Sequence, residues 1–355
     1  MSCLAEARPR LKLAKPGGRS PEFVQVSTAA AITLGALPGR MHRCGGTQCL
    51  NLLLTYPEGC RANCSYCGLA RHRDATSAYA DRNFIRVDWP TLALDALIAG
   101  AKTAPFERMC ISMITHPRAE EDTLAVLKSW RAGSTVPVSI LSNPTTMGRA
   151  DVQALHDAGA DIFTVSLDAA TPALFAEHRG KSRESPHHWR KYWDVFGHAR
   201  DIFGPGRIGM HIIVGLGETD RDVLELCRDL HAVGGHSHLF CFFPERGSQL
   251  AHLPAPPRAR WRRVQLARYL IEFAGIPFTE LRFDPAGALT GFGTDVTAIV
   301  ASGVPFRTSG CPGAVRDDIS ACNRPYGDSP PSDIASFPYA PWEDDMARIR
   351  EQLDE

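Results

Sequence analysis

Short apolar runs alternate with amphipathic segments along most of the chain, and each amphipathic segment has the spacing of a helix with one buried face. The predicted strands are 50–55, 108–113, 136–141, 162–166, 208–214 and 238–243, and the predicted helices are 89–102, 120–131, 149–158, 188–202, 218–233 and 257–273. Because crossovers between parallel strands are right-handed, this order predicts an α/β fold whose parallel sheet curls into a barrel or part of one. Barrel enzymes place their sites at the carboxyl ends of the strands.

Length and composition restrict the class of protein. A chain of 355 residues is long enough for one large α/β domain, here 41–275, with an N-terminal extension (1–40, one short helix near 28–34) and a C-terminal segment (276–355). With 39 basic and 39 acidic residues, no bulk positive field indicates a nucleic-acid partner. Residues 1–20 do not resemble a signal peptide, and no apolar stretch is long enough for a membrane span. We therefore expect a cytoplasmic protein whose clustered cysteines hold metal.

Three cysteines follow the first predicted strand directly. Cys60, Cys64 and Cys67 are separated by three and then two residues. Three thiolates at this spacing can bind three irons of a [4Fe-4S] cluster and leave the fourth iron without a protein ligand. The alternative is a structural zinc site in which His72 is the fourth ligand.

Polar residues and glycines follow three of the predicted strands. Ser142 and Asn143 end the third strand, and Ser166 and Asp168 end the fourth; each side chain either contacts a ligand or caps the next helix. After the fifth strand, Gly215 and Glu218 belong to the sequence GLGE, which either approaches a ligand or forms a strand-to-helix turn. Arg179, in the polar loop after the fourth strand, either pairs with a carboxylate or is exposed to solvent, and we expect the second.

A second group of cysteines is divided between the two ends of the chain. Cys311 and Cys322 lie among glycine and proline in the C-terminal segment, and Cys44 and Cys49 precede and begin the first strand. These four cysteines predict an auxiliary iron-sulfur cluster. Because Cys49 lies at the start of an extended strand of about six residues, we expect this cluster roughly 20 Å from the first one. The alternative is unrelated free thiols. We expect the other cysteines of the barrel to be buried core thiols; these are Cys110, Cys227 and Cys241.

The cysteine triplet resembles the motif of the radical S-adenosylmethionine (SAM) superfamily. The resemblance implies an open (β/α)6 barrel, a [4Fe-4S] cluster on Cys60, Cys64 and Cys67, and SAM on the open iron, where electron transfer cleaves it to a 5'-deoxyadenosyl radical. It further implies SAM or substrate contacts from a set of seven residues: Tyr66, Ser142, Asn143, Ser166, Asp168, Gly215 and Glu218. The chain departs from the superfamily at 112–118, where many members carry a GGE-type motif.

The segments CLNLLLTYPEGCRANCSYCGLAR, TSGCPG and CNRPY are similar to biotin-synthase-like proteins, most closely the two-component lipoyl synthases of archaea and some bacteria. That resemblance implies sulfur insertion into an octanoyl chain on a lipoyl carrier domain or peptide, with sulfur from the auxiliary cluster. It also implies a second radical SAM synthase subunit and an electron donor such as ferredoxin or flavodoxin. One departure is the insertion of residues 314–321 between the two C-terminal cysteines.

Two other functions are compatible with the same residues. One is a radical SAM mutase or lyase, or a biotin-synthase-like sulfurtransferase, that acts on a small molecule. The other is a non-enzymatic iron-sulfur or zinc scaffold, in which neither group of cysteines supports SAM cleavage. Neither a nucleic acid nor a membrane is expected as a partner.

Overall fold

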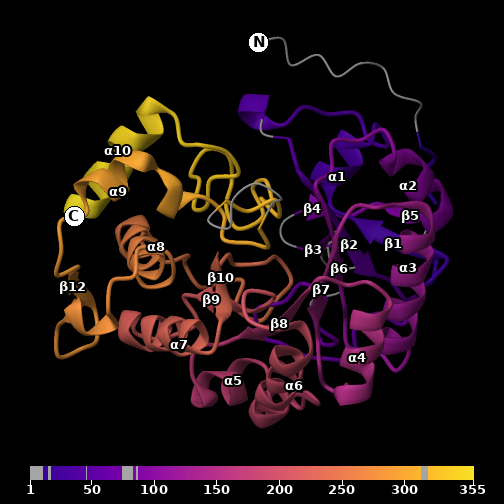
Figure 1. The fold of residues 1–355 in the computed structure, drawn as a ribbon, viewed down its shortest axis with the longest axis horizontal. Helices are drawn as coiled ribbons and strands as arrows, with labels where there is room; N and C mark the ends of the chain where they lie inside the picture. Colours follow the sequence, from indigo (N-terminus) through magenta and orange to yellow (C-terminus); the bar gives the residue numbers. More distant parts are fainter. Residues whose placement is uncertain (1–10, 15–16, 45, 74–82, 85–86, 313–318) are drawn as a thin grey trace.

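A computed structural model describes residues 11–14, 17–44, 46–73, 83–84, 87–312 and 319–355. Six parallel strands pair in chain order (Figure 1). They are β2 (Cys49–Leu54), β6 (Arg108–Ser112), β7 (Val138–Ser142), β8 (Ile162–Asp168), β9 (Ile208–Val214) and β10 (Gly235–Cys241). The predicted α/β fold, a partial (β/α)6 barrel, is confirmed, and the six strands fall within a few residues of their expected positions.

Helices cover the outside of the curved sheet (Figure 1). They are α2 (Leu94–Ala101), α3 (Ala119–Gly133), α4 (Arg149–Asp157), α5 (Pro172–His178), α6 (Trp189–Phe203), α7 (Asp220–Ala232) and α8 (Arg258–Glu272); short elements between them are β3 (Asn83–Phe84), β4 (Val87–Asp88) and η2 (Lys181–Arg183). The helix predicted from residue 89 begins only at Leu94, because Pro90 disfavours helical backbone at Trp89 and Thr91–Ala93 forms strand β5.

The N-terminal region contributes a strand that we did not predict. Strand β1 (Phe23–Val26) pairs antiparallel with β2 on one side and with β5 on the other, so the sheet order is β10-β9-β8-β7-β6-β2-β1-β5. Val24 and Val26 are buried in the main core, but a run of four residues is too short for a clear alternating pattern. The expected short helix is present as α1 (Thr28–Thr33), and the hydroxyl of Ser27 caps it by accepting from Ala30 N at 3.2 Å.

The C-terminal segment lies along the open side of the barrel. It contains η3 (Phe278–Glu280), β11 (Arg282–Phe283), β12 (Leu289–Gly291), α9 (Thr297–Ser302), η4 (Val304–Phe306) and α10 (Glu343–Asp354). At the edge strand β10, Leu239 N donates to the Ser309 hydroxyl at 2.7 Å. At the other side, Asn323 accepts from Gln48 N at 3.2 Å and donates to the carbonyls of Gly46 (3.0 Å) and Pro338 (2.9 Å). The segment therefore joins β10 to the residues that precede β2.

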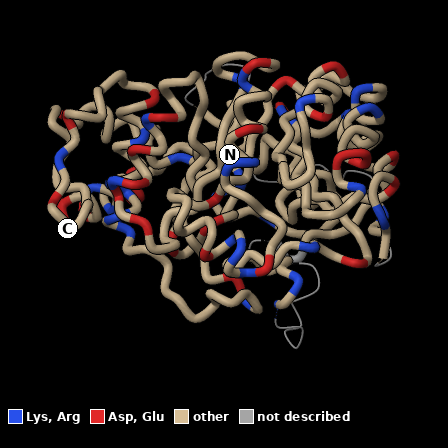
Figure 2. Tube along the Cα trace, turned by 90° about the horizontal axis from the view of Figure 1, so that it is seen from below, with Lys and Arg blue, Asp and Glu red and all other residues tan. Residues whose placement is uncertain are grey.

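Acidic and basic residues are interspersed over the molecule (Figure 2), as the equal numbers of each sign lead one to expect. The largest fully buried side chains include Trp130, Trp261 and Phe163, and the main core lies on both faces of the sheet. None of the described helices combines the length and the apolar character needed to cross a lipid bilayer.

Replacing Asn323 with alanine is expected to loosen the C-terminal segment. The change leaves buried backbone groups without partners, so we expect the free energy of unfolding to fall by about 1–3 kcal/mol. Urea unfolding followed by circular dichroism measures this quantity. The control is Gln153→Ala on exposed helix α4, which should change it by no more than about 0.5 kcal/mol; equal effects of the two changes would contradict the anchoring role.

Candidate active site

The three-cysteine loop follows the carboxyl end of β2, where the fold predicts a site. Cys60, Cys64 and Cys67 are free thiols that line one cavity of about 430 Å³. Backbone hydrogen bonds shape the loop: Cys67 N donates to Cys64 O at 3.2 Å, and Arg61 N donates to Thr115 O at 2.8 Å. The structure thus brings the predicted triplet together at the cavity wall.

His178, at the end of α5, fixes the middle of this loop. Its Nδ1 lies 3.0 Å from the Ser65 hydroxyl, its Nε2 lies 2.9 Å from the Leu216 carbonyl, and its own carbonyl accepts from Ser65 N at 2.8 Å. The buried ring thereby ties the cysteine loop to the turn that follows β9. The sequence offered no signal for this role, because a single histidine near a helix end has many possible partners.

Burial makes the thiolate forms of the loop cysteines costly. It raises the pKa of Cys64 to about 11 and raises the pKa of Cys67 well above the usual thiol value, and repulsion from Cys64 and Cys60 adds to the effect on Cys67. Three neighbouring thiolates therefore need a cationic occupant. Iron of an iron-sulfur cluster fits this donor set, because binding releases the thiol protons and neutralises the thiolates.

The alternative zinc site finds no support in the contacts of His72. Its Nδ1 lies 3.4 Å from Asn63 Nδ2, and its Nε2 accepts from Arg71 Nε at 3.2 Å, so both ring nitrogens are engaged away from the cysteines. Across the described ranges, no three His, Cys, Asp or Glu side chains gather closely enough to hold a single metal ion. In an iron-sulfur cluster each iron binds a different cysteine, so the three sulfurs need not meet at one ion. The cysteine triplet therefore fits a cluster better than it fits a zinc ion.

A buried polar network forms the adjacent wall. The Tyr66 hydroxyl donates to Asp168 at 2.6 Å. Arg179 pairs with Asp168 and donates to the Tyr66 hydroxyl at 2.7 Å and to the Ser166 hydroxyl at 3.1 Å. Arg179 is only 4% exposed, which corrects the expectation that it faces solvent. The sequence was misleading because the neighbours of Arg179 along the chain are polar, whereas its partners lie on β8 and in the cysteine loop.

Four of the seven residues predicted to contact SAM or substrate line the cavity: Tyr66, Asn143, Ser166 and Asp168. Two others, Ser142 and Glu218, use their polar atoms within the fold, and contacts from them to SAM or substrate stay predictions. The Ser142 hydroxyl donates to Thr164 O at 2.9 Å, between two strands. The Glu218 carboxylate accepts from Gly215 N (2.7 Å) and Leu216 N (2.9 Å) and pairs with Arg260.

Gly215 is needed for close packing behind the cavity wall. Its φ is +118°, and a Cβ atom there would lie 2.5 Å from Pro256 Cγ. The turn formed by GLGE is therefore stabilised by its own glutamate and by backbone that only glycine adopts easily. A contact between the Gly215 backbone and SAM stays a prediction.

A second group of thiols lies at the other end of the same cavity. Four cysteines contact one another there: Cys49, Cys110, Cys311 and Cys322. The register of β2 and β6 places Cys110 opposite Asn51, so the same face of the sheet carries both. From that position Asn51 Nδ2 lies 3.3 Å from the sulfur of Cys322 and 3.5 Å from that of Cys49.

The membership of this group differs from the prediction. Cys49, Cys311 and Cys322 were expected, but Cys110 was expected to be an ordinary core thiol. The side chain of Cys44 and residues 313–318 of the insertion lie outside the described residues. Strands of a barrel are buried on both faces, so the sequence of β6 does not reveal which side chains point inward.

One thiol of the second group differs from the others in the direction of its pKa shift. Hydrogen bonds from Cys110, Cys49 and Asn51 lower the pKa of Cys322 well below the usual thiol value. Burial raises the pKa of Cys49 well above that value, and it raises the pKa of Cys311 to about 11. Four buried cysteines that pack in one cluster are the donor set that iron-sulfur clusters use, so the group fits such a cofactor.

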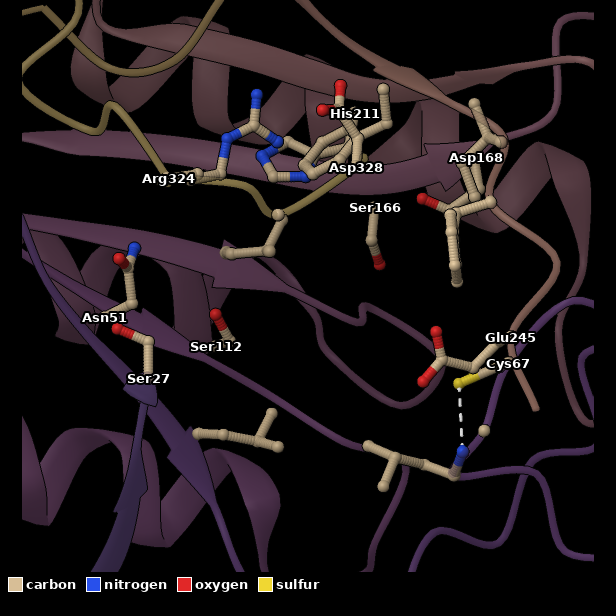
Figure 3. Close-up of a pocket in the computed structure, with 18 of the residues that line it drawn as sticks. Ser27, Asn51, Cys67, Ser112, Ser166, Asp168, His211, Glu245, Arg324 and Asp328 are labelled. Atoms are coloured by element: carbon tan, nitrogen blue, oxygen red, sulfur yellow. Dashed lines mark hydrogen bonds between the residues drawn. The ribbon is translucent and has the colours of Figure 1, made fainter. Parts of the chain in front are cut away.

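Both thiol groups open onto the one cavity. Figure 3 shows Cys67, Glu245 and Asp168 at one end and Asn51 and Arg324 at the other, with Ser112 and Ser166 between them. The cavity wall is largely apolar, and its apolar lining residues include Leu53, Met113, Ile114, Leu141, Ile213 and Phe242. The arrangement can hold an apolar group between two cysteine sites.

Comparison with known families identifies the domain. Residues 54–230, about half of the chain, match the model of the radical SAM superfamily. This range contains the cysteine triplet and the strands that carry the polar network. The chain therefore belongs to the radical SAM superfamily and is a radical SAM enzyme. A comparison with curated proteins found no match.

Solved structures with a similar fold include two proteins with different functions. The FeFe-hydrogenase maturase HydG from Carboxydothermus hydrogenoformans has a TM-score of 0.49 and 16% identity, covering 69% of this chain and 55% of its own. Coproporphyrinogen III oxidase (HemN) from Escherichia coli has a TM-score of 0.43 and 13% identity, covering 81% and 65%. The chain thus spans about half the length of HydG. At these identities the likeness concerns the fold alone.

Replacing His178 with alanine should impair the first cluster. We expect less iron in the three-cysteine loop after anaerobic reconstitution, because Ser65 and the Leu216 turn lose their common partner. Iron and sulfide analysis with electron paramagnetic resonance (EPR) of the reduced protein measures the loss. His156→Ala, on the exposed face of α4, is the control, and an iron content in His178→Ala equal to that of this control would contradict the role of His178.

Proposed function

We propose that this radical SAM enzyme inserts sulfur into unactivated carbon–hydrogen bonds, as one component of a two-component lipoyl synthase. The substrate would be an octanoyl chain, amide-linked to a lysine of a lipoyl carrier domain or peptide. One observation carries the proposal: a single apolar cavity connects the three-cysteine loop with a second group of four cysteines. A radical enzyme with a second buried sulfur-rich site has a source of sulfur beside its substrate.

The residues of the three-cysteine loop would hold the first cofactor. Cys60, Cys64 and Cys67 would bind three irons of a [4Fe-4S] cluster. When bound, this cluster and SAM supply a 5'-deoxyadenosyl radical that takes a hydrogen atom from the substrate carbon. Tyr66 and Asp168 present a hydroxyl and a carboxylate to the same space. Asp168 has a left-handed backbone (φ +67°), which the buried contact with Arg179 helps to maintain.

The residues of the second group would hold the auxiliary cluster. Cys49 and Cys110 come from strands, and Cys311 and Cys322 come from the C-terminal segment. When bound, this cluster supplies the sulfur for each new carbon–sulfur bond and takes up the one electron that forming this bond releases. Three of these cysteines also line the cavity, so the sulfur source faces the space for substrate.

The apolar wall suits an alkyl chain and protects a carbon radical. Lining residues such as Leu53, Leu141 and Ile213 carry no thiol, the side-chain group from which a carbon radical most readily takes a hydrogen atom. Exclusion of water from such a space suppresses side reactions of an intermediate. An octanoyl chain has no polar group near its end, so its burial here costs no hydrogen bond.

The partners follow from the sequence resemblance. They are the octanoylated carrier, a second radical SAM synthase subunit and an electron donor such as ferredoxin or flavodoxin. The contacts within this chain support a sulfur source beside an apolar cavity for the substrate.

Anaerobic reconstitution with iron and sulfide tests the two cofactor sites. We expect about eight irons per chain for two cubes, and about four for Cys110→Ser, which removes one donor of the second group. Cys227→Ala is the matched control, because Cys227 is a buried thiol of helix α7 away from both groups and should leave the count unchanged. A wild-type count that stays near four would remove the sulfur donor.

Mass spectrometry tests the reaction. An octanoylated carrier peptide incubated anaerobically with SAM, reductant and the protein, alone and with a candidate partner, should gain the mass of one or two sulfur atoms. Cys110→Ser should still cleave SAM to 5'-deoxyadenosine but form no sulfur-containing product. Product formation by that variant, or SAM cleavage with no sulfur gain in the wild-type protein under either condition, would contradict the proposal.

A further inference from the structure

Arg324 is a buried cation whose hydrogen-bonding capacity is only partly used. Its Nη2 donates to the Ser309 carbonyl at 2.7 Å, and its guanidinium carbon lies 3.6 Å from the centre of the Phe240 ring. Its Nε and Nη1 atoms are buried and have no hydrogen-bond partner among the described residues. Leaving donors of a buried cation unpaired is costly, so this position indicates an acceptor that is not a side chain or backbone group.

The acceptor has to lie on the cavity side of Arg324. The side chain lines the cavity beside His211 and Asp328 (Figure 3). Asp328 is already engaged, because its carboxylate accepts from the Ser336 hydroxyl at 2.6 Å. Arg324 lines the same cavity as Cys110, Cys311 and Cys322, and it follows Cys322 by two residues. The unused donors therefore lie beside the second cysteine group.

Asn51 directs a donor at the same group from a different element. Arg324 follows Cys322 in the C-terminal segment, whereas Asn51 is on β2 and reaches the sulfurs of Cys322 and Cys49. The Asn51 side chain is buried, so no bulk water competes for its amide. Donors from two separate parts of the chain thus converge on one set of sulfur atoms.

We propose that Arg324 and Asn51 are positioning residues that donate hydrogen bonds to the sulfur atoms of the second cluster and raise its reduction potential. This inference rests on the proposed function, because it requires a cluster on the four cysteines. One-electron reduction adds one negative charge to a cluster. A nearby cation and hydrogen-bond donors stabilise the reduced form more than the oxidised form. In the proposed reaction the cluster takes up one electron for each carbon–sulfur bond, so a higher potential favours sulfur transfer.

The test is a redox titration of the second cluster followed by EPR. A full-length protein with Cys60, Cys64 and Cys67 all changed to alanine provides a background in which only this cluster contributes. In that background, Arg324→Met and Asn51→Leu should each shift the midpoint potential to a more negative value. Arg324→Lys retains the charge and a donor, and it should give a smaller shift than Arg324→Met.

The outcomes separate this inference from the proposed function. An unchanged potential in both Arg324→Met and Asn51→Leu would overturn the inference while leaving the cluster in place. Loss of the second cluster's iron in both Arg324→Met and Arg324→Lys would also overturn it, since Arg324 would then be required as a ligand. If the wild-type protein holds only about four irons per chain, the second cluster itself is missing and the proposed function fails.

Discussion

The attachment of the C-terminal segment to the residues before β2 is the interaction on which the second site depends. Six parallel strands leave the barrel open, and β1 occupies the edge of β2 that would otherwise face the last strand. Asn323 and Ser309 connect the segment to the two sides of this opening. Cys311 and Cys322 thereby reach Cys49, which no local part of the sequence brings near them. An incomplete barrel therefore provides space for a cofactor site that a closed sheet would exclude.

The two cysteine groups have different structural origins, and this explains their different surroundings. The first group belongs to one short loop, so its spacing follows from local sequence, and His178 and backbone bonds hold it from outside. The second group joins two strands to a distant segment, so tertiary packing alone assembles it. The two groups lie at opposite ends of one largely apolar cavity, with Ser112 and Ser166 between them. Such a division suits a reaction that begins at one end and is completed at the other.

The sequence predicted most of the architecture because repeated strand–helix units allow few arrangements. It missed β1, whose four residues carry too little pattern, and it extended one helix across Pro90. In the candidate site, local motifs mark the residues that line the cavity: the cysteine triplet, Tyr66, Asn143, Ser166 and Asp168. The surroundings of Cys110 and Arg179 could not be predicted from the sequence, because Cys110 packs against distant cysteines and Arg179 contacts Tyr66. Glu218 and Ser142 show that a polar residue beside a strand end can satisfy the backbone of its own turn or of its neighbouring strand.

The division of the second cysteine group between the start and the end of the chain affects biosynthesis. Cys49 and Cys110 leave the ribosome long before Cys311 and Cys322, whereas the three-cysteine loop is synthesised within a few residues. The first cofactor site can therefore be completed during translation, but the second is completed only when the finished chain folds back on itself. Maturation of the protein is then ordered in time, and a prematurely terminated chain would retain the motif for radical generation without the complete second site.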